Sequence, residues 1–173
     1  RHTRFRNVTG VQTCALPIYT LASVNNLAIL LKTKGDYAGA EPLYRRALAG
    51  FEKALGPEHP STLSSVNNLA LLLSDQGDYA GAEPLYRRAL AGYEKALGPE
   101  HPSTLRSVNN LAILLSKQGD YAGAEPLFRR ALAGYEKALG PEHPRTLDSV
   151  NNLANLLYRK ADYADRKSTR LNS

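Results

Sequence analysis

Residues 62–98 read TLSSVNNLALLLSDQGDYAGAEPLYRRALAGYEKALG, and this stretch decides the fold of the chain. Its first part carries apolar residues three and four positions apart, at Leu63, Val66, Leu69, Ala70 and Leu73. That spacing places them on one face of a helix. The sequence therefore predicts a helix from Leu63 to about Asp75, with Thr62 as its N-cap.

A second helix is predicted after a short turn. Gly77 can adopt the left-handed conformation that ends a helix, and Asp78 can cap the next one. A second apolar series then runs through Ala82, Leu85, Tyr86, Ala89, Leu90, Tyr93 and Leu97. Gly98-Pro99 ends this helix, and Pro84 lies inside it, where it removes one backbone hydrogen bond.

This helix pair recurs along the chain with a period of 42 residues. Residues 57–98 and 99–140 are identical at 38 of 42 positions, and the Asn-Asn-Leu-Ala motif of residues 67–70 returns at 25–28, 109–112 and 151–154. A fixed period in this range is typical of a solenoid, in which each unit buries its apolar face against the next. The period holds from Thr20 to Ala164.

The repeat resembles the tetratricopeptide repeat, whose characteristic positions are occupied here by Leu69, Gly77, Tyr79, Ala82, Tyr86 and Ala89. Its length, the segment 82–90 (AEPLYRRAL) and the LGPEHP linker are similar to the kinesin-light-chain subtype. The resemblance implies an all-α solenoid, a right-handed superhelix of stacked antiparallel helix pairs. It covers three repeats (20–55, 62–97 and 104–139) and part of a fourth (146–164), in which Ala161 stands where the other repeats have glycine.

Both ends of the chain fall outside the period, and we predict that neither is native. Residues 165–173 (DRKSTRLNS) are the translation of a widely used short-read sequencing adapter, and residues 8–18 are the translation of its reverse complement. We therefore assign residues 1–18 and 165–173 to adapter sequence and residues 19–164 to the repeat array. The array is expected to be a piece of a longer one.

The tails account for most of the net charge of +6. Without them the chain has 16 basic and 15 acidic residues, so a nucleic-acid partner is not expected. No apolar run is long enough to span a membrane, and we expect no membrane partner. The single cysteine, Cys14, lies in a tail and says nothing about redox compartment. Resemblance to kinesin light chains implies a cytoplasmic location.

Near-identical repeats differ mainly along one stripe of the first helix. Three of the four differences between repeats 2 and 3 are Ser64/Arg106, Leu71/Ile113 and Asp75/Lys117, at relative positions 0, +7 and +11. At about 100° per residue these positions coincide on the side opposite the predicted core. In the family this face lines a concave groove that holds peptides.

We predict that this stripe forms a peptide-binding groove with an amide column, an apolar column and several cations. The candidate residues are Asn26, Asn68, Asn110, Asn152, Leu71, Ile113, Arg106, Lys117 and Arg159. The cations favour an acidic peptide, and the apolar positions favour an aromatic or aliphatic anchor. Asparagine is unfavourable inside helices, so the doublets need compensation, either from a ligand or from amide bonds between neighbouring helices. We favour the second, structural role for Asn25, Asn67, Asn109 and Asn151.

No residue pattern indicates catalysis, a metal site or a cofactor. His59, His101 and His143 occur once per repeat in the linkers, where we expect them to pack or cap rather than to bind metal. The doublets Arg45-Arg46, Arg87-Arg88 and Arg129-Arg130 lie on the second helix, where one arginine is expected to cover apolar surface and the other to face solvent. A stripe that binds acidic groups on that side is the alternative.

The leading hypothesis is a non-enzymatic scaffold that binds a peptide segment of a partner protein in the concave groove. By resemblance, kinesin-light-chain-like arrays bind cargo or adaptor peptides. Two alternatives remain open. One is a sensor or regulatory array in a larger signalling protein that carries a nucleotide hydrolase or a protease. The other is a structural spacer without a ligand.

Overall fold

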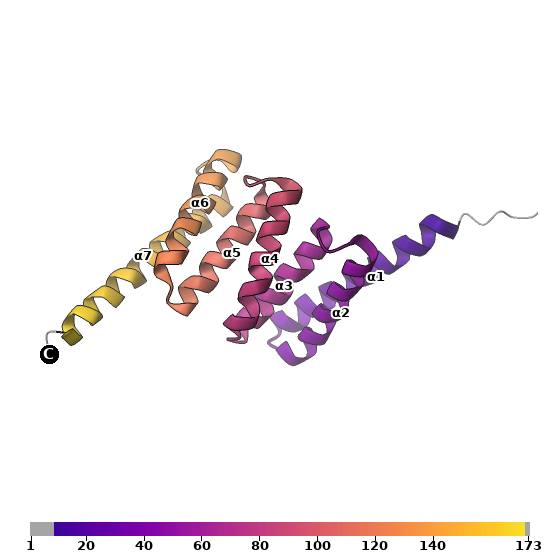
Figure 1. Cartoon of the computed structure of the whole chain (residues 1–173), viewed down its shortest axis with the longest axis horizontal. Coiled ribbons are helices and arrows are strands. Elements are labelled where there is room, and N and C mark those ends of the chain that lie inside the picture. Colours follow the sequence, from indigo (N-terminus) through magenta and orange to yellow (C-terminus); the bar gives the residue numbers. More distant parts are fainter. Residues whose placement is uncertain (1–8, 172–173) are drawn as a thin grey trace, which may run out of the picture.

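The computed structural model describes the backbone of residues 9–171 and the side chains of residues 18–163. That part of the chain is helical throughout apart from its turns and linkers, and it contains no strand. Its helices are α1 (Thr9–Thr33), α2 (Tyr37–Leu55), α3 (Pro60–Asp75), α4 (Tyr79–Leu97), α5 (Pro102–Gln118), α6 (Tyr121–Leu139) and α7 (Pro144–Leu171). The all-α repeat array predicted from the sequence is confirmed (Figure 1).

Helices pair within each repeat and stack along the long axis of the molecule (Figure 1). The pairs are α1 with α2, α3 with α4 and α5 with α6, and each second helix also packs on the first helix of the next repeat. The backbones of neighbouring first helices come close to one another, whereas those of α2, α4 and α6 do not, and long side chains alone bridge these second helices. The first helices therefore lie on the inner, more crowded side of the stack.

A histidine caps the interior first helices. Nδ1 of His59 accepts a hydrogen bond from the backbone N–H of Ser61 at 3.1 Å, and His101 and His143 repeat this bond. Pro60 occupies the first turn, where its missing N–H costs nothing. The prediction of Thr62 as the cap was wrong, because the helix begins earlier. The hydroxyl of Thr62 instead donates to the carbonyl of Gly56 at 2.8 Å and ties down the linker.

The turn between the two helices forms as predicted. Gly77 has a φ of 85°, which a residue with a Cβ adopts only at a cost. Oδ1 of Asp78 accepts from the N–H of Gly81 at 2.9 Å and caps α4. Pro84 lies inside α4, and Gly98 ends it. The same turn recurs in repeats 1 and 3 because its residues recur.

The core lies between the two layers of helices, as one large cluster and a smaller one around Leu105 and Tyr135. Val66, Leu69 and Leu73 of α3 are buried, as are the small residues Ala82 and Ala89 of α4. These confirm the predicted core faces. The side chain of Leu63 on α3 occupies the space beside Gly92 on α4. A Cβ added to Gly92 would lie 2.5 Å from Cδ2 of Leu63. Equivalent contacts join Gly50 to Leu21 and Gly134 to Leu105.

The last helix differs from the other first helices. Helix α7 continues past the position at which α3 and α5 end, and it reaches Leu171. Ala161 replaces the glycine that ends α3 and α5, and alanine does not readily adopt the left-handed conformation. Tyr163, carried by the continuing helix, meets Tyr121 edge to face with ring centroids 6.0 Å apart.

Both ends of the array leave apolar residues exposed. Leu147 is 50% exposed, whereas its counterpart Leu63 is 1% exposed against α4. Leu157 is exposed, whereas Leu153 is buried and belongs to the core cluster that continues from the preceding repeats. The assignment of residues 1–18 and 165–173 to adapter sequence falls almost wholly on residues whose side chains are not described, and it stays a prediction.

Candidate functional site

The stripe along which the repeats differ lies outside the core, on the first helices. Ser64 and Leu71 are half-buried on α3, and Asp75 is exposed. On α5 the matching residues are Arg106 and Lys117, both exposed, and half-buried Ile113. The remaining difference, Tyr86 against Phe128, is buried in the core. Leu71 and Ile113 also pack against the core cluster, so they offer only part of their surface.

The asparagines form a ladder between consecutive first helices. The Nδ2 amide of Asn68 donates to Oδ1 of Asn25 at 3.3 Å. Asn110 donates in the same way to Asn67, and Asn152 to Asn109, at 3.1 and 3.2 Å. The predicted amide bond between neighbouring helices is therefore present. Each rung joins the second asparagine of one doublet to the first asparagine of the preceding doublet. Asn26 is exposed on α1.

The three candidate cations of the stripe have different surroundings. The guanidinium of Arg106 lies near the buried hydroxyl of Tyr93, and it opposes the rise in the pKa of Tyr93 that burial causes. Nζ of Lys117 lies 3.5 Å from Oδ1 of Asp75, whose other carboxylate oxygen pairs with Lys32 at 2.8 Å. Positions that match in successive repeats lie side by side, which brings these opposite charges together. Arg159 donates to Oδ1 of Asn155 at 3.1 Å within α7.

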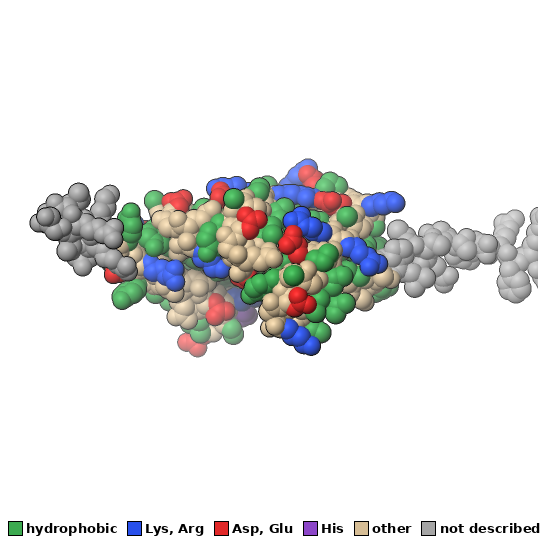
Figure 2. All heavy atoms as spheres, turned by 90° about the horizontal axis from the view of Figure 1, so that it is seen from below, with side chains coloured by type: hydrophobic (Ala, Val, Ile, Leu, Met, Phe, Trp, Pro, Cys, Tyr) green, Lys and Arg blue, Asp and Glu red, His purple; other side chains and the backbone are tan. Residues whose placement is uncertain are grey.

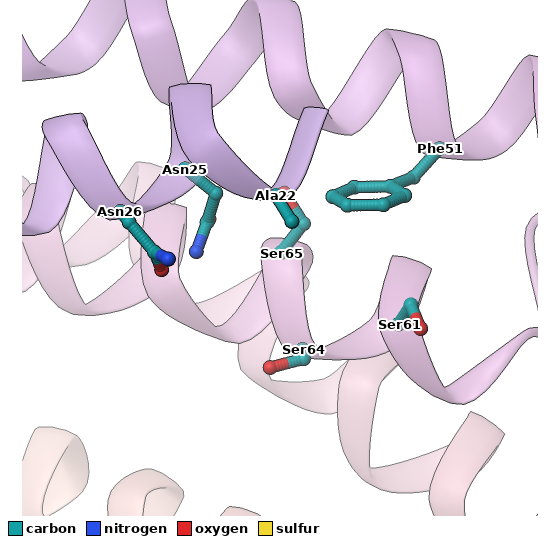
Figure 3. A pocket seen from close by; sticks show the side chains of 7 residues that line it. All are labelled: Ala22, Asn25, Asn26, Phe51, Ser61, Ser64 and Ser65. Carbon is teal, nitrogen blue, oxygen red and sulfur yellow. The ribbon is translucent and has the colours of Figure 1, made fainter. Parts of the chain in front are cut away.

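A small hollow opens where α1 and α3 meet the end of α2. The ring of Phe51 reaches from α2 toward Ala22 and Ser65, and Asn25, Asn26, Ser61 and Ser64 complete the wall (Figure 3). The hollow encloses about 220 Å³. No charged side chain lines it. Typical ligand pockets are larger, at least about 300 Å³, so this hollow suits a single side chain rather than a whole small molecule.

An equivalent hollow lies two repeats further along, where α5 and α7 meet the end of α6. It encloses about 200 Å³, and its wall is Arg106, Asn109, Tyr135, Arg145, Asp148 and Ser149. Burial raises the pKa of the Tyr135 phenol, and the nearby guanidinium groups of Arg145 and Arg106 oppose that rise. Two arginines therefore converge on the hydroxyl of Tyr135.

Ion pairs on the outer side hold successive repeats in register. Arg88 of α4 pairs with Glu52 of α2 at 2.7 Å, and Arg130 of α6 pairs with Glu94 of α4 in the same way. Arg87 pairs with Glu83 along its own helix and is more exposed than Arg88. Positive and negative side chains alternate on the face seen in Figure 2 and form no patch of one sign.

The described residues bear on metal binding and on membrane insertion as well. Within residues 18–163, no three metal-binding side chains gather in one place. The linker histidines cap helices, as one of the predicted roles requires. None of the helices whose residues are described is long and apolar enough to cross a membrane.

The sequence matches the tetratricopeptide repeat family at residues 19–95, 64–137 and 105–165. The chain belongs to the tetratricopeptide repeat (TPR) family. Such repeats generally mediate protein–protein interactions and are typically non-catalytic. No curated protein sequence matched the TPR array.

Solved structures support the same assignment. The nearly identical, kinesin-light-chain TPR-like repeats of a Podosopora anserina protein superpose with a TM-score of 0.75 at 33% identity, over 81% of this chain and 66% of that one. BtubC (BKLC) of P. vanneervenii gives 0.72 at 23% identity, over 88% and 66%. The N-terminal domain of C. elegans stress-induced protein-1 gives 0.58 at 15% identity, over 81% and 96%. The last two show the fold alone. The array spans just under two thirds of the first two chains.

The hollows and Arg145 were not predicted from the sequence. Tyr93 was assigned to the core and is buried as predicted, and its counterparts Phe51 and Tyr135 are buried as well, but these two also line the hollows. Arg145 replaces a serine that repeats 2 and 3 share, Ser61 and Ser103. Arg145 lies in the first turn of α7, outside the stripe that the differences between repeats 2 and 3 define. A comparison that included repeat 4 could have found it.

Proposed function

We propose that the TPR array is a scaffold that holds an extended peptide segment of a partner protein along its first helices. The observation that carries the proposal is the location of the differences between repeats 2 and 3. Ser64/Arg106 and Asp75/Lys117 lie on the inner helices outside the core, and Leu71/Ile113 lies on the same helices, half-buried at the edge of the core. Packing in the core does not require these differences between repeats. Residues that vary in this way can determine which ligand the array binds.

The chemistry of this face favours a peptide with acidic residues and an aromatic or aliphatic anchor. Arg106 is exposed, and Leu71 and Ile113 present part of their apolar surface beside it. Lys117 contributes less than its charge suggests, because Asp75 partly neutralises it. The amides of Asn68, Asn110 and Asn152 each give one N–H to the ladder, which leaves further hydrogen-bonding capacity for a peptide backbone. A cytoplasmic location, implied by the resemblance to kinesin light chains, belongs to the same proposal.

The test is selection from a random peptide library with the full chain as bait, followed by affinity measurement on two matched variants. Arg106→Ser with Lys117→Thr removes two cations of the stripe. The new residues are those that other repeats carry at the matching positions, Ser64 in repeat 2 and Thr33 in repeat 1. Arg46→Ser with Lys53→Thr removes the same two charges from exposed positions on α2. The first variant should lose affinity for the selected peptides severalfold, and the second should not. If the first variant binds the selected peptides as tightly as the wild-type chain does, the stripe is not the peptide-binding site.

A structural spacer is the second candidate, and the asparagine ladder is the observation that favours it. All three rungs join first helices to one another, so the conspicuous Asn doublets have a role without any ligand. The same library selection separates the two functions. A spacer yields no enriched peptide, whereas a scaffold yields peptides that compete with one another for one face.

A further inference from the structure

The two hollows on the first-helix side are the same site built twice with different chemistry. Each lies between two consecutive first helices and the aromatic residue near the end of the intervening second helix. Every residue that lines the α5–α7 hollow stands 84 positions after one that lines the α1–α3 hollow, as in Ala22/Arg106, Phe51/Tyr135 and Ser61/Arg145. The shape is therefore conserved within the chain while the charge changes.

Three differences between the repeats place charged side chains in the α5–α7 hollow. Arg106 and Arg145 stand in place of Ala22 and Ser61, and Asp148 stands in place of Ser64. Among the described side chains, neither arginine forms an ion pair, and Asp148 forms none with either of them. The net charge of the hollow is thus positive, and its guanidinium groups have no carboxylate partner.

We propose that this hollow binds an acidic side chain of the bound peptide, while the α1–α3 hollow beside Phe51 binds an uncharged side chain of the same peptide. This inference rests on the proposed scaffold function. A guanidinium presents a planar set of donors that matches a carboxylate, and two of them facing one hollow select that group. The α1–α3 hollow offers an aromatic ring, an alanine and hydroxyl groups, and it has no group to pair with a buried charge.

The separation of the hollows sets the spacing of the two side chains. First helices of neighbouring repeats are in contact, and packed helices lie about 10 Å apart. The hollows are two repeats apart, so they lie roughly 20 Å from one another. An extended peptide rises about 3.3 Å per residue, and about six residues therefore separate its uncharged and acidic side chains. The chain direction of the peptide is fixed as well, because the two hollows differ.

Direct binding of synthetic peptides to the full chain tests this inference. The probes are dye-labelled Ala/Ser peptides, each with one Leu and one Glu at increasing separation in both orders, and affinity is read by fluorescence polarisation. Affinity should peak near a separation of about six residues in one order only. Arg106→Ser with Arg145→Ser restores residues found in repeat 2, and it should weaken the best peptide roughly tenfold. Asp148→Ser should strengthen binding, since it removes the opposing charge.

The serine variants could lose affinity simply because the hollow is distorted. A variant that gains a binding preference avoids this ambiguity. Ala22→Arg with Ser61→Arg copies the two arginines into the α1–α3 hollow, and peptides with Glu at both positions should then bind best. If the wild-type chain binds selected peptides but Glu adds nothing, or the double serine variant binds equally well, the inference fails and the scaffold function stands. If no peptide from the random library binds at all, the scaffold function itself fails.

Discussion

Asn110 on α5 donates a hydrogen bond of 3.1 Å to Asn67 on α3, one repeat earlier in the chain. Asn67 is 5% exposed, so its amide oxygen has little access to water and depends on this bond. The rung explains how a residue that disfavours helices can recur in every first helix. Asparagine lowers the stability of the helix locally, and the rung offsets this loss with a hydrogen bond that forms only when the repeats stack in the correct register.

Removing a rung should destabilise the array. Asn67→Ala is expected to lower the free energy of unfolding by about 1–2 kcal/mol, because the Asn110 amide loses its acceptor and the gain in helix propensity is smaller. Asn26→Ala is the control, since Asn26 is exposed on α1 and the same change should be neutral or slightly stabilising there. Urea unfolding measures both. A neutral Asn67→Ala would mean that the ladder contributes nothing.

The histidine caps should have a measurable effect of their own. His101→Ala leaves the N–H of Ser103 without its acceptor, and it should cost about 1 kcal/mol of stability. His101→Asn supplies another side chain that caps helices well, and it should retain most of that stability. Thermal unfolding of the two variants decides between capping and mere linker packing. Equal loss in both variants would indicate packing.

The buried tyrosines should make the array sensitive to alkaline pH. Burial raises the pKa of Tyr86, and burial likewise raises the pKa values of Tyr93 and Tyr135. Above the ordinary tyrosine pKa of about 10, the unfolded chain loses phenolic protons that the folded chain retains, so stability falls as pH rises. The contribution is present in full below that pKa and is lost above it.

Tyr86→Phe isolates this effect, because repeat 3 already carries Phe128 at the matching position. The variant should match the wild type near neutral pH and become more stable than it by about 1 kcal/mol for each pH unit above 10. Urea unfolding at neutral and at alkaline pH gives the comparison. A constant difference across the pH range would show that ionisation of Tyr86 is not linked to folding.

Local stability should vary along the array. The interior residues Leu63 and Val66 are buried, whereas their counterparts in α7, Leu147 and Val150, are exposed. Terminal units of a repeat array lack one of their two neighbours, so they open more readily. Hydrogen exchange should be slowest in residues 62–97 and fastest in α7. Uniform protection along the chain would contradict a stack held together by contacts between neighbours.

Periodicity was sufficient to predict the fold, because each repeat supplies its own turn glycine, capping aspartate and core residues. It was less reliable at boundaries. Thr62 was misassigned because serine and threonine are common caps, and the capping role of His59 depends on an imidazole orientation that no spacing reveals.

The candidate site was only partly predictable. Helical spacing predicts that Arg106 and Lys117 share one stripe, but it could not show that Asp75 lies beside Lys117, because that contact crosses from one repeat to the next. The hollows depend on three helices at once. Arg145 enters the α5–α7 hollow from the start of α7, and no pattern within one helix connects it to Tyr135 near the end of α6.

The most direct test of the scaffold function is to locate a bound peptide on the array. Backbone amide NMR shifts of the full chain are recorded with and without a peptide recovered from the random library. The shifts should change along the first helices, at Ser64, Arg106 and Ile113 and at the residues around the two hollows, and the second helices should be unaffected on their outer side. Changes concentrated at Arg87, Arg88, Arg129 and Arg130, or no changes at all, would contradict a binding face on the first helices.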